Sequence, residues 1–172
     1  MTADETELTA DVVGRLMYRR DVALARQRSA LARAMGLNDV EMLALLHLRE
    51  QGPLAPTQIA RLLDLSSGGA TALVQRLERT GHVRRQPHPT DRRSTLIRLT
   101  EPSAERIEAA RRPLAEGLER AISRLLASER PAIARFLTEL ASLSERVTAG
   151  ARQEPGSSAP DAVRRPVPSL WA

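Results

Sequence analysis

The 172-residue chain contains no cysteine and no lysine, and its only aromatic residues are Tyr18, Phe136 and Trp171. The absence of cysteine excludes disulfide frameworks, cysteine-ligated zinc and thiol nucleophiles. The shortage of aromatic side chains disfavours a single-strand nucleic-acid binder built on stacking platforms. Double-stranded nucleic acid remains open as a partner.

Long hydrophobic runs are also missing. No stretch approaches the roughly 20 apolar residues that span a bilayer, and the first residues are acidic and polar, unlike a secretory signal. The length corresponds to about one domain. We therefore expect a single cytoplasmic domain without a membrane partner.

Positive charge is concentrated in one part of the chain. All 26 basic residues are arginine, against 21 acidic residues, and the formal net charge is +5. Residues 57–99 contain eight arginines and three acidic residues, so this segment holds the whole excess and the remainder is formally neutral. Such a segment is typical of a polyanion-binding surface, although a solvated charged face has the same composition.

The first half of the chain shows helical periodicity. Apolar residues predict a long helix over about 11–35 and a second helix that ends near Gly52, where Asn38 and Glu41 form a capping-box pattern. Pro56 suits the first turn of a third helix. Ser66 or Ser67 would cap a fourth helix that ends at Gly81 and buries a series of apolar residues, Ala70, Leu73, Val74 and Leu77.

The pattern changes after Gly81. Residues 82–85 and 94–100 are strand-like and flank a turn at 87–91, which predicts a hairpin with arginines at its tip. A long helix over about 102–127 should bend near Ala109 because of Pro113, and Ser128 should cap a last helix. Residues 1–10 should be flexible, and a tail over 150–172 should be disordered.

This order of elements predicts a mainly α fold with a small β-hairpin wing, a winged helix-turn-helix over about residues 38–100. In such folds the second helix of the helix-turn-helix enters the major groove, while the hairpin contacts an adjacent minor groove or phosphates.

Three stretches resemble the MarR (multiple-antibiotic-resistance regulator) family of bacterial transcription factors. They are Leu62–Ser66, Leu73–Val83 and the wing segment Pro89–Thr100, whose Asp91, Arg93, Leu99 and Thr100 match the family pattern. The resemblance covers about residues 11–149. It departs after Thr100, where Glu101, Pro102 and Ser103 stand in place of a glycine that the family often has.

The resemblance implies a single MarR-like domain over 11–149 and an obligate homodimer, with dimerisation helices over about 11–35 and 102–149. It also implies a palindromic double-stranded DNA operator and release by a small-molecule effector between the dimerisation and DNA-binding regions. The chemistry of that effector stays open.

Candidate DNA contacts on the fourth helix are the residues left after its apolar face is removed. Gln75 could pair with adenine, Thr71 could contact a base edge or a thymine methyl, and Arg76 could read guanine or clamp a phosphate. Ser67 at the helix N-terminus suits a phosphate. An ordinary exposed helix surface is the alternative. The full set is Ser66, Ser67, Gly68, Thr71, Ala72, Gln75, Arg76 and Arg79.

Candidate contacts in the wing are arginines and one acid. We expect Asp91 to orient one arginine while Arg92 or Arg93 enters the minor groove, the alternative being an ion pair that only stiffens the turn. Three strand residues are phosphate candidates, or else part of a solvated edge: Arg84, Arg85 and Arg98.

No pattern points to an enzyme, a metal or a cofactor. His47 and Glu50 lie one helical turn apart, but two ligands do not make a metal site, and no catalytic triad or phosphate-binding loop is present. The leading hypothesis is a homodimeric, ligand-responsive repressor of pseudo-palindromic DNA. The alternative is a helical dimer that binds protein and does not read DNA, and activation instead of repression also stays open.

Overall fold

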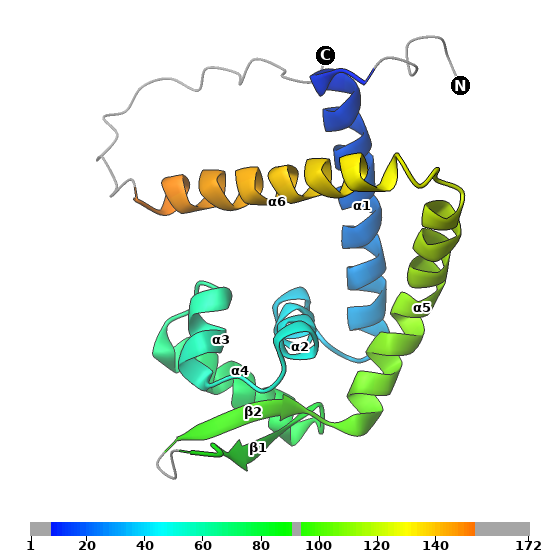
Figure 1. Ribbon diagram of the computed structural model, residues 1–172. Coiled ribbons are helices and arrows are strands. Elements are labelled where there is room, and N and C mark those ends of the chain that lie inside the picture. The colour runs from blue at the N-terminus through cyan, green and yellow to red at the C-terminus, as the bar shows by residue number, and fades with distance from the viewer. Residues whose placement is uncertain (1–7, 91–93, 154–172) are drawn as a thin grey trace, which may run out of the picture. The chain divides into compact units, whose positions relative to one another are not determined.

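The computed structural model describes residues 8–90 and 94–153 and confirms a mainly helical chain with one antiparallel hairpin (Figure 1). The chain divides into two compact units, Met1–Pro113 and Leu114–Ala172. In chain order the elements are α1 (Ala10–Ala34), α2 (Asp39–Gln51), α3 (Pro56–Leu62), α4 (Ser67–Arg79), β1 (Val83–Pro87), β2 (Thr95–Leu99), α5 (Glu101–Ser123) and α6 (Arg130–Gln153).

Local sequence sets the starts of α2 and α4. The predicted capping box of α2 is present: the Glu41 backbone N–H donates to Asn38 Oδ1 at 2.9 Å, and the Asn38 backbone N–H donates to Glu41 Oε2 at 3.0 Å. Of the two serines expected to cap α4, Ser66 is the N-cap, since its Oγ accepts the Gly69 N–H at 3.1 Å. Both helices therefore begin at residues whose side chains satisfy unpaired backbone donors.

The turn between α3 and α4 places Asp64 in the left-handed region, with φ of +55°. The Leu65 N–H then donates to the Ala60 carbonyl at 2.9 Å, which closes the end of α3 as a Schellman motif. Beyond the turn, α4 buries the predicted apolar face, Ala70, Leu73, Val74 and Leu77. The helix-turn-helix is thus held by one tight turn and a shared core.

The core of the first unit joins α2, α3, α4, β2 and the start of α5. Met42, Leu45, Ile59, Ile97 and Ile107 are almost completely buried in it. Ile97 also exchanges two backbone hydrogen bonds with Leu54, at 2.8 and 3.0 Å, so β2 pairs with β1 on one side and with Leu54 on the other. This pairing fixes the hairpin against the helix-turn-helix.

Three helix boundaries differ from those predicted from the sequence. The long helix α5 ends at Ser123, not near residue 127. The last helix α6 begins at Arg130, and Glu129, not Ser128, precedes it: the Glu129 carbonyl accepts the Ile133 N–H, and its carboxylate accepts the Leu126 N–H at 2.7 Å. α6 continues to Gln153, so the first residues of the tail expected over 150–172 are helical. The rest of that tail, residues 154–172, lies outside the described residues.

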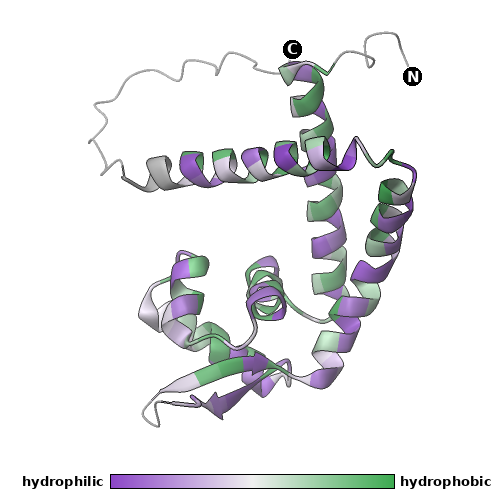
Figure 2. Cartoon of the chain, in the orientation of Figure 1, coloured by the Kyte–Doolittle hydropathy of each residue, from purple (hydrophilic) through white to green (hydrophobic). Residues whose placement is uncertain are grey.

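Exposed apolar residues follow both long C-terminal helices. Figure 2 shows hydrophobic and hydrophilic residues alternating along α5 and α6. Within the second unit, exposed apolar residues of these helices and of their connection are 38–66% exposed, and they are Leu114, Leu118, Ile122, Leu126, Ile133, Phe136, Leu137, Leu143 and Val147.

Candidate nucleic-acid interface

The outer face of α4 is open to solvent along its whole length. All eight predicted contact residues on and before this helix are exposed, opposite the buried apolar face. The structure therefore brings this set together on one surface: Ser66, Ser67, Gly68, Thr71, Ala72, Gln75, Arg76 and Arg79.

Two of the three hydroxyl groups at the N-terminal end of this face, those of Ser66 and Thr71, are engaged within the chain. Ser66 Oγ is engaged in the cap, and Thr71 Oγ1 donates to the Ser67 carbonyl at 2.8 Å, which leaves the Thr71 methyl and an acceptor oxygen for a partner. A side chain added at Gly68 would meet nothing within 4 Å, whereas at Gly69 it would meet Ser66 Oγ at 3.3 Å. Gly69 thus fits the cap, and Gly68 leaves the helix surface bare.

Arg76 is held from outside its own helix. Its Nε donates to Glu41 Oε1 at 2.9 Å, so the capping glutamate of α2 also binds the middle of α4. Burial alone would raise the pKa of Glu41, but the hydrogen bonds from Arg76 and from the Asn38 backbone, with the charges of Arg76 and His82, lower it below its ordinary value. Glu41 is therefore a carboxylate at neutral pH.

The arginines of the hairpin do not share one face. Directly paired residues of an antiparallel ladder point to the same side, so Arg84 and its partner Arg98 lie on one side and Arg85 on the other. Arg85 Nε donates to Glu78 Oε2 at 3.1 Å and so joins the hairpin to α4. Among the three hairpin arginines, only Arg85 forms an ion pair with a described residue of this helix.

On α4 itself, Arg79 forms no ion pair with any described residue.

The predicted contacts at the tip of the wing, Asp91, Arg92 and Arg93, lie outside the described residues. The described hairpin is paired up to the residues beside them, since the His88 N–H donates to the Ser94 carbonyl at 3.0 Å.

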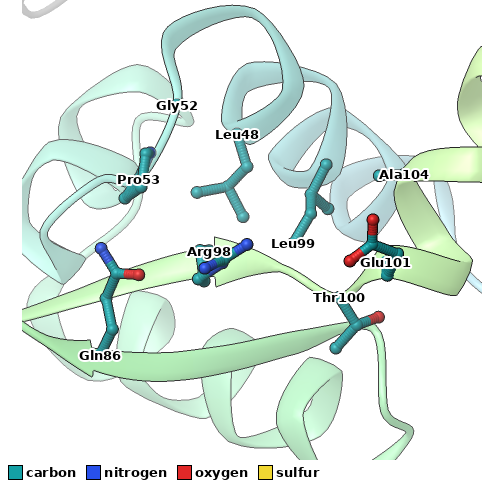
Figure 3. Close-up of a pocket in the computed structure, with 9 residues that line it drawn as sticks. All are labelled: Leu48, Gly52, Pro53, Gln86, Arg98, Leu99, Thr100, Glu101 and Ala104. Atoms are coloured by element: carbon teal, nitrogen blue, oxygen red, sulfur yellow. The ribbon is translucent and has the colours of Figure 1, made fainter.

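A hollow of about 430 Å³ lies on the Arg98 side of the hairpin. Figure 3 shows Arg98 near Leu48, with Glu101 at the start of α5. The hollow combines an apolar wall with a guanidinium and a carboxylate, and it is lined by Leu48, Gly52, Pro53, Gln86, Arg98, Leu99, Thr100, Glu101 and Ala104.

Within residues 8–90 and 94–153, no group of three or more histidine, aspartate or glutamate side chains could hold a metal ion. His47 Nδ1 contacts the Gln51 amide at 3.4 Å, and Glu50 forms an ion pair with Arg111. In the same part of the chain, no helix has the length and apolar character needed to cross a membrane.

Comparison with known proteins identifies the family to which the chain belongs. The sequence profile of the MarR family matches residues 35–94. YcgE of Bacillus subtilis (strain 168), an uncharacterized HTH-type transcriptional regulator, is 36% identical over 112 residues, which cover 65% of this chain and 71% of YcgE. The chain belongs to the MarR family of transcriptional regulators.

Two other relatives show how far the likeness extends. The HTH-type transcriptional repressor NicR of Pseudomonas putida is 26% identical over 137 residues, 80% of this chain and 84% of NicR. The crystal structure of Streptococcus pneumoniae FabT in complex with DNA has the same fold, with a TM-score of 0.60 and 21% identity over 79% of this chain and 96% of FabT.

Sequence reasoning missed the acidic partners of the interface. Glu41 was read only as part of a cap, and Glu78 was not singled out, although each binds an arginine of the predicted contact set. Glu41 and Arg76 are 35 positions apart, so no local spacing could reveal their contact.

Proposed function

We propose that this MarR-family chain is a homodimeric repressor that binds a pseudo-palindromic operator in double-stranded DNA. The observation that carries the proposal is the exposed polar face of α4, joined to an arginine-bearing hairpin through Arg85 and Glu78, in the one segment of the chain with excess positive charge. Such a helix fits the major groove, and the hairpin beside it reaches the flanking backbone or minor groove.

Each exposed group on this face suits a part of the duplex. Gln75 can pair with an adenine edge, and the Thr71 methyl can contact a thymine methyl because the Thr71 hydroxyl proton is engaged with Ser67. Ser67 and the bare backbone at Gly68 suit a phosphate at the helix N-terminus. Arg79 and Arg84 form no ion pair with any residue that the structure describes, and they can supply positive charge for further phosphates.

The relatives support both DNA binding and repression. FabT shares this fold and was crystallised with DNA, and NicR is named a repressor. Dimerisation is supported by the apolar residues exposed on α5 and α6, since Leu114, Leu118 and Ile122 recur every four residues on one side of a helix. On a pseudo-palindromic operator the two α4 helices of a homodimer would bind half-sites about one duplex turn, roughly 34 Å, apart.

The hollow beside Arg98 is our proposal for the effector site. Its guanidinium and apolar wall suit a small organic anion. Benzoate can serve as a probe: it should raise the melting temperature of the unmodified protein, and the R98A variant should show no such rise. An equal rise in both proteins would argue that the anion binds elsewhere.

The function is tested by gel shift with the DNA upstream of the chain's own gene. We expect retardation of that fragment at moderate salt in the presence of a large excess of unrelated duplex. A Gln75→Ala variant should still bind but discriminate less between the two duplexes, whereas an Arg79→Ala variant should bind both more weakly. A protein that retards neither fragment would support the protein-interaction alternative.

A further inference from the structure

One carboxylate links the start of α2 to the DNA-facing side of α4. Glu41 Oε2 accepts the Asn38 backbone N–H at 3.0 Å, and Glu41 Oε1 accepts the Arg76 Nε–H at 2.9 Å. Both oxygens are thus engaged, and the Glu41 side chain is only 10% exposed. The Glu41 carboxylate is therefore held in one orientation, and it restricts the orientation of the Arg76 guanidinium that it binds.

The guanidinium of Arg76 is left with one edge engaged and one edge open. An arginine has five N–H donors in a rigid fork, and the Nε–H is the one that Glu41 takes. The terminal nitrogens make no hydrogen bond with any described residue, and the side chain is 45% exposed on the outer face of α4. The open edge is therefore presented to whatever covers that face.

We propose that Glu41 is a positioning residue for DNA binding, which holds Arg76 so that the open edge of its guanidinium meets a DNA phosphate. The inference rests on the proposed function and adds to it a residue that does not touch the DNA. An unpaired arginine loses side-chain entropy when it is ordered on DNA, whereas Arg76 is already ordered by Glu41. The Glu41 carboxylate thereby strengthens binding to a polyanion despite its own negative charge.

The direction in which DNA affinity changes when Glu41 is substituted separates the proposal from a general charge effect. Removing an acid close to the DNA should tighten binding if only the net charge of the surface mattered. Loss of the Glu41 carboxylate should instead weaken binding, because the E41Q amide replaces one of the two accepting oxygens by an NH2 group, which cannot accept a hydrogen bond.

The experiment is a double-mutant cycle on the full chain, with a duplex that the unmodified protein selects from a random pool. Binding is measured by fluorescence anisotropy at 150 mM salt for the unmodified protein and for the E41Q, R76A and E41Q/R76A variants. We expect E41Q and R76A each to weaken binding about tenfold, and the double variant to bind no more weakly than R76A alone. Unchanged or tighter binding by E41Q, or losses that multiply in the double variant, would overturn the proposal.

Two further variants separate positioning from folding. Asn38→Ala removes the other half of the capping box but leaves the Glu41–Arg76 pair, so it should lower the melting temperature without changing DNA affinity. Arg76→Lys keeps the charge, but a single ammonium cannot hold Glu41 and a phosphate in the same fork geometry, so it should bind as weakly as R76A. Full affinity in R76K would overturn the proposal even if E41Q failed to fold.

The outcomes also separate this inference from the proposed function. If the unmodified protein selects no duplex, the DNA-binding function itself fails and the inference fails with it. If the unmodified protein binds and E41Q binds equally well, only the role of Glu41 is wrong.

Discussion

Protonation of Glu41 should affect α4, because the Glu41 carboxylate accepts a hydrogen bond from Arg76 of that helix. Burial raises the pKa of its carboxyl, but the hydrogen bonds from Arg76 and from the Asn38 backbone N–H outweigh that effect, so the pKa in the folded chain is lowered. A carboxyl with a lowered folded pKa stabilises the fold above its unfolded pKa, about 4.3, and loses that contribution as pH falls through the folded pKa.

We therefore predict that E41Q is less stable than the unmodified protein at pH 7 and that this difference shrinks below about pH 4.3. Urea unfolding of both proteins at pH 7 and at pH 3 measures it. A difference that stayed constant between these pH values would show that Glu41 stabilises the fold by its shape and not by its charge.

Gly68 is a residue where stability and function should change in opposite directions. It lies in the first turn of α4, and an added Cβ would meet nothing within 4 Å. Gly68→Ala should raise the free energy of unfolding by about 0.5–1 kcal/mol, since glycine is a poor helix former. If the bare backbone lies against DNA, the same methyl group should weaken duplex binding.

Chemical denaturation and anisotropy titration of the same preparation test this prediction. Gly69→Ala is the comparison for stability, because its Cβ would lie 3.3 Å from Ser66 Oγ and crowd the cap. Gain of stability in G68A with undiminished DNA affinity would mean that the backbone at Gly68 stays away from the duplex.

At the level of secondary-structure elements, the turn between α3 and α4 depends on a left-handed residue that is not glycine. Asp64 has φ of +55°, a conformation that aspartate tolerates and a β-branched residue does not. Asp64→Val should lower the free energy of unfolding by about 1–2 kcal/mol. Asp64→Gly should cause no such loss, and equal stability of the two variants would contradict this role of the turn.

The elements could be predicted from sequence where local rules decide them. Asn38 with Glu41, Pro56 in a first turn, and the apolar series from Ala70 to Leu77 each depend on residues within a few positions of one another. The predicted cap of α6 was wrong: Ser128 is a good cap by residue type, but α6 begins at Arg130, and the Glu129 carbonyl accepts the Ile133 N–H. Two local solutions competed there, and residue preferences alone could not rank them.

The sequence predicted which residues of the candidate site are exposed, but not the ion pairs between them. Exposure of Gln75 and Arg79 follows from the helical period, and the structure confirms it. The pairing of Arg76 with Glu41 and of Arg85 with Glu78 depends on how α2 and the hairpin pack against α4. Such contacts depend on the tertiary fold. The sequence alone therefore could not predict which arginines form ion pairs and which remain without one.

At the scale of the whole molecule, apolar side chains on the C-terminal helices should bury themselves in a second copy. Leu118 is 55% exposed on α5, between Leu114 and Ile122. Leu118→Arg should shift the protein from dimer to monomer at micromolar concentration, because it places a charge in the centre of an apolar contact. Sedimentation velocity measures the change.

A matched substitution tests whether any arginine on α5 would have this effect. Glu116→Arg changes the charge of the same helix at an exposed position next to Arg120, outside the apolar series. It should remain dimeric. Monomers in both variants, or dimers in both, would show that Leu118 does not lie in the contact between copies.

The expectation for residues 57–99 is that their excess positive charge binds duplex DNA. Its most direct test is the salt dependence of the equilibrium constant for the selected duplex, measured between 50 and 300 mM salt, a range chosen because counterion release dominates there. A dimer that neutralises several phosphates should show a slope of log K against log salt of about −4 or steeper. A slope near zero, or no binding at the lowest salt, would show that this positive charge does not bind duplex DNA.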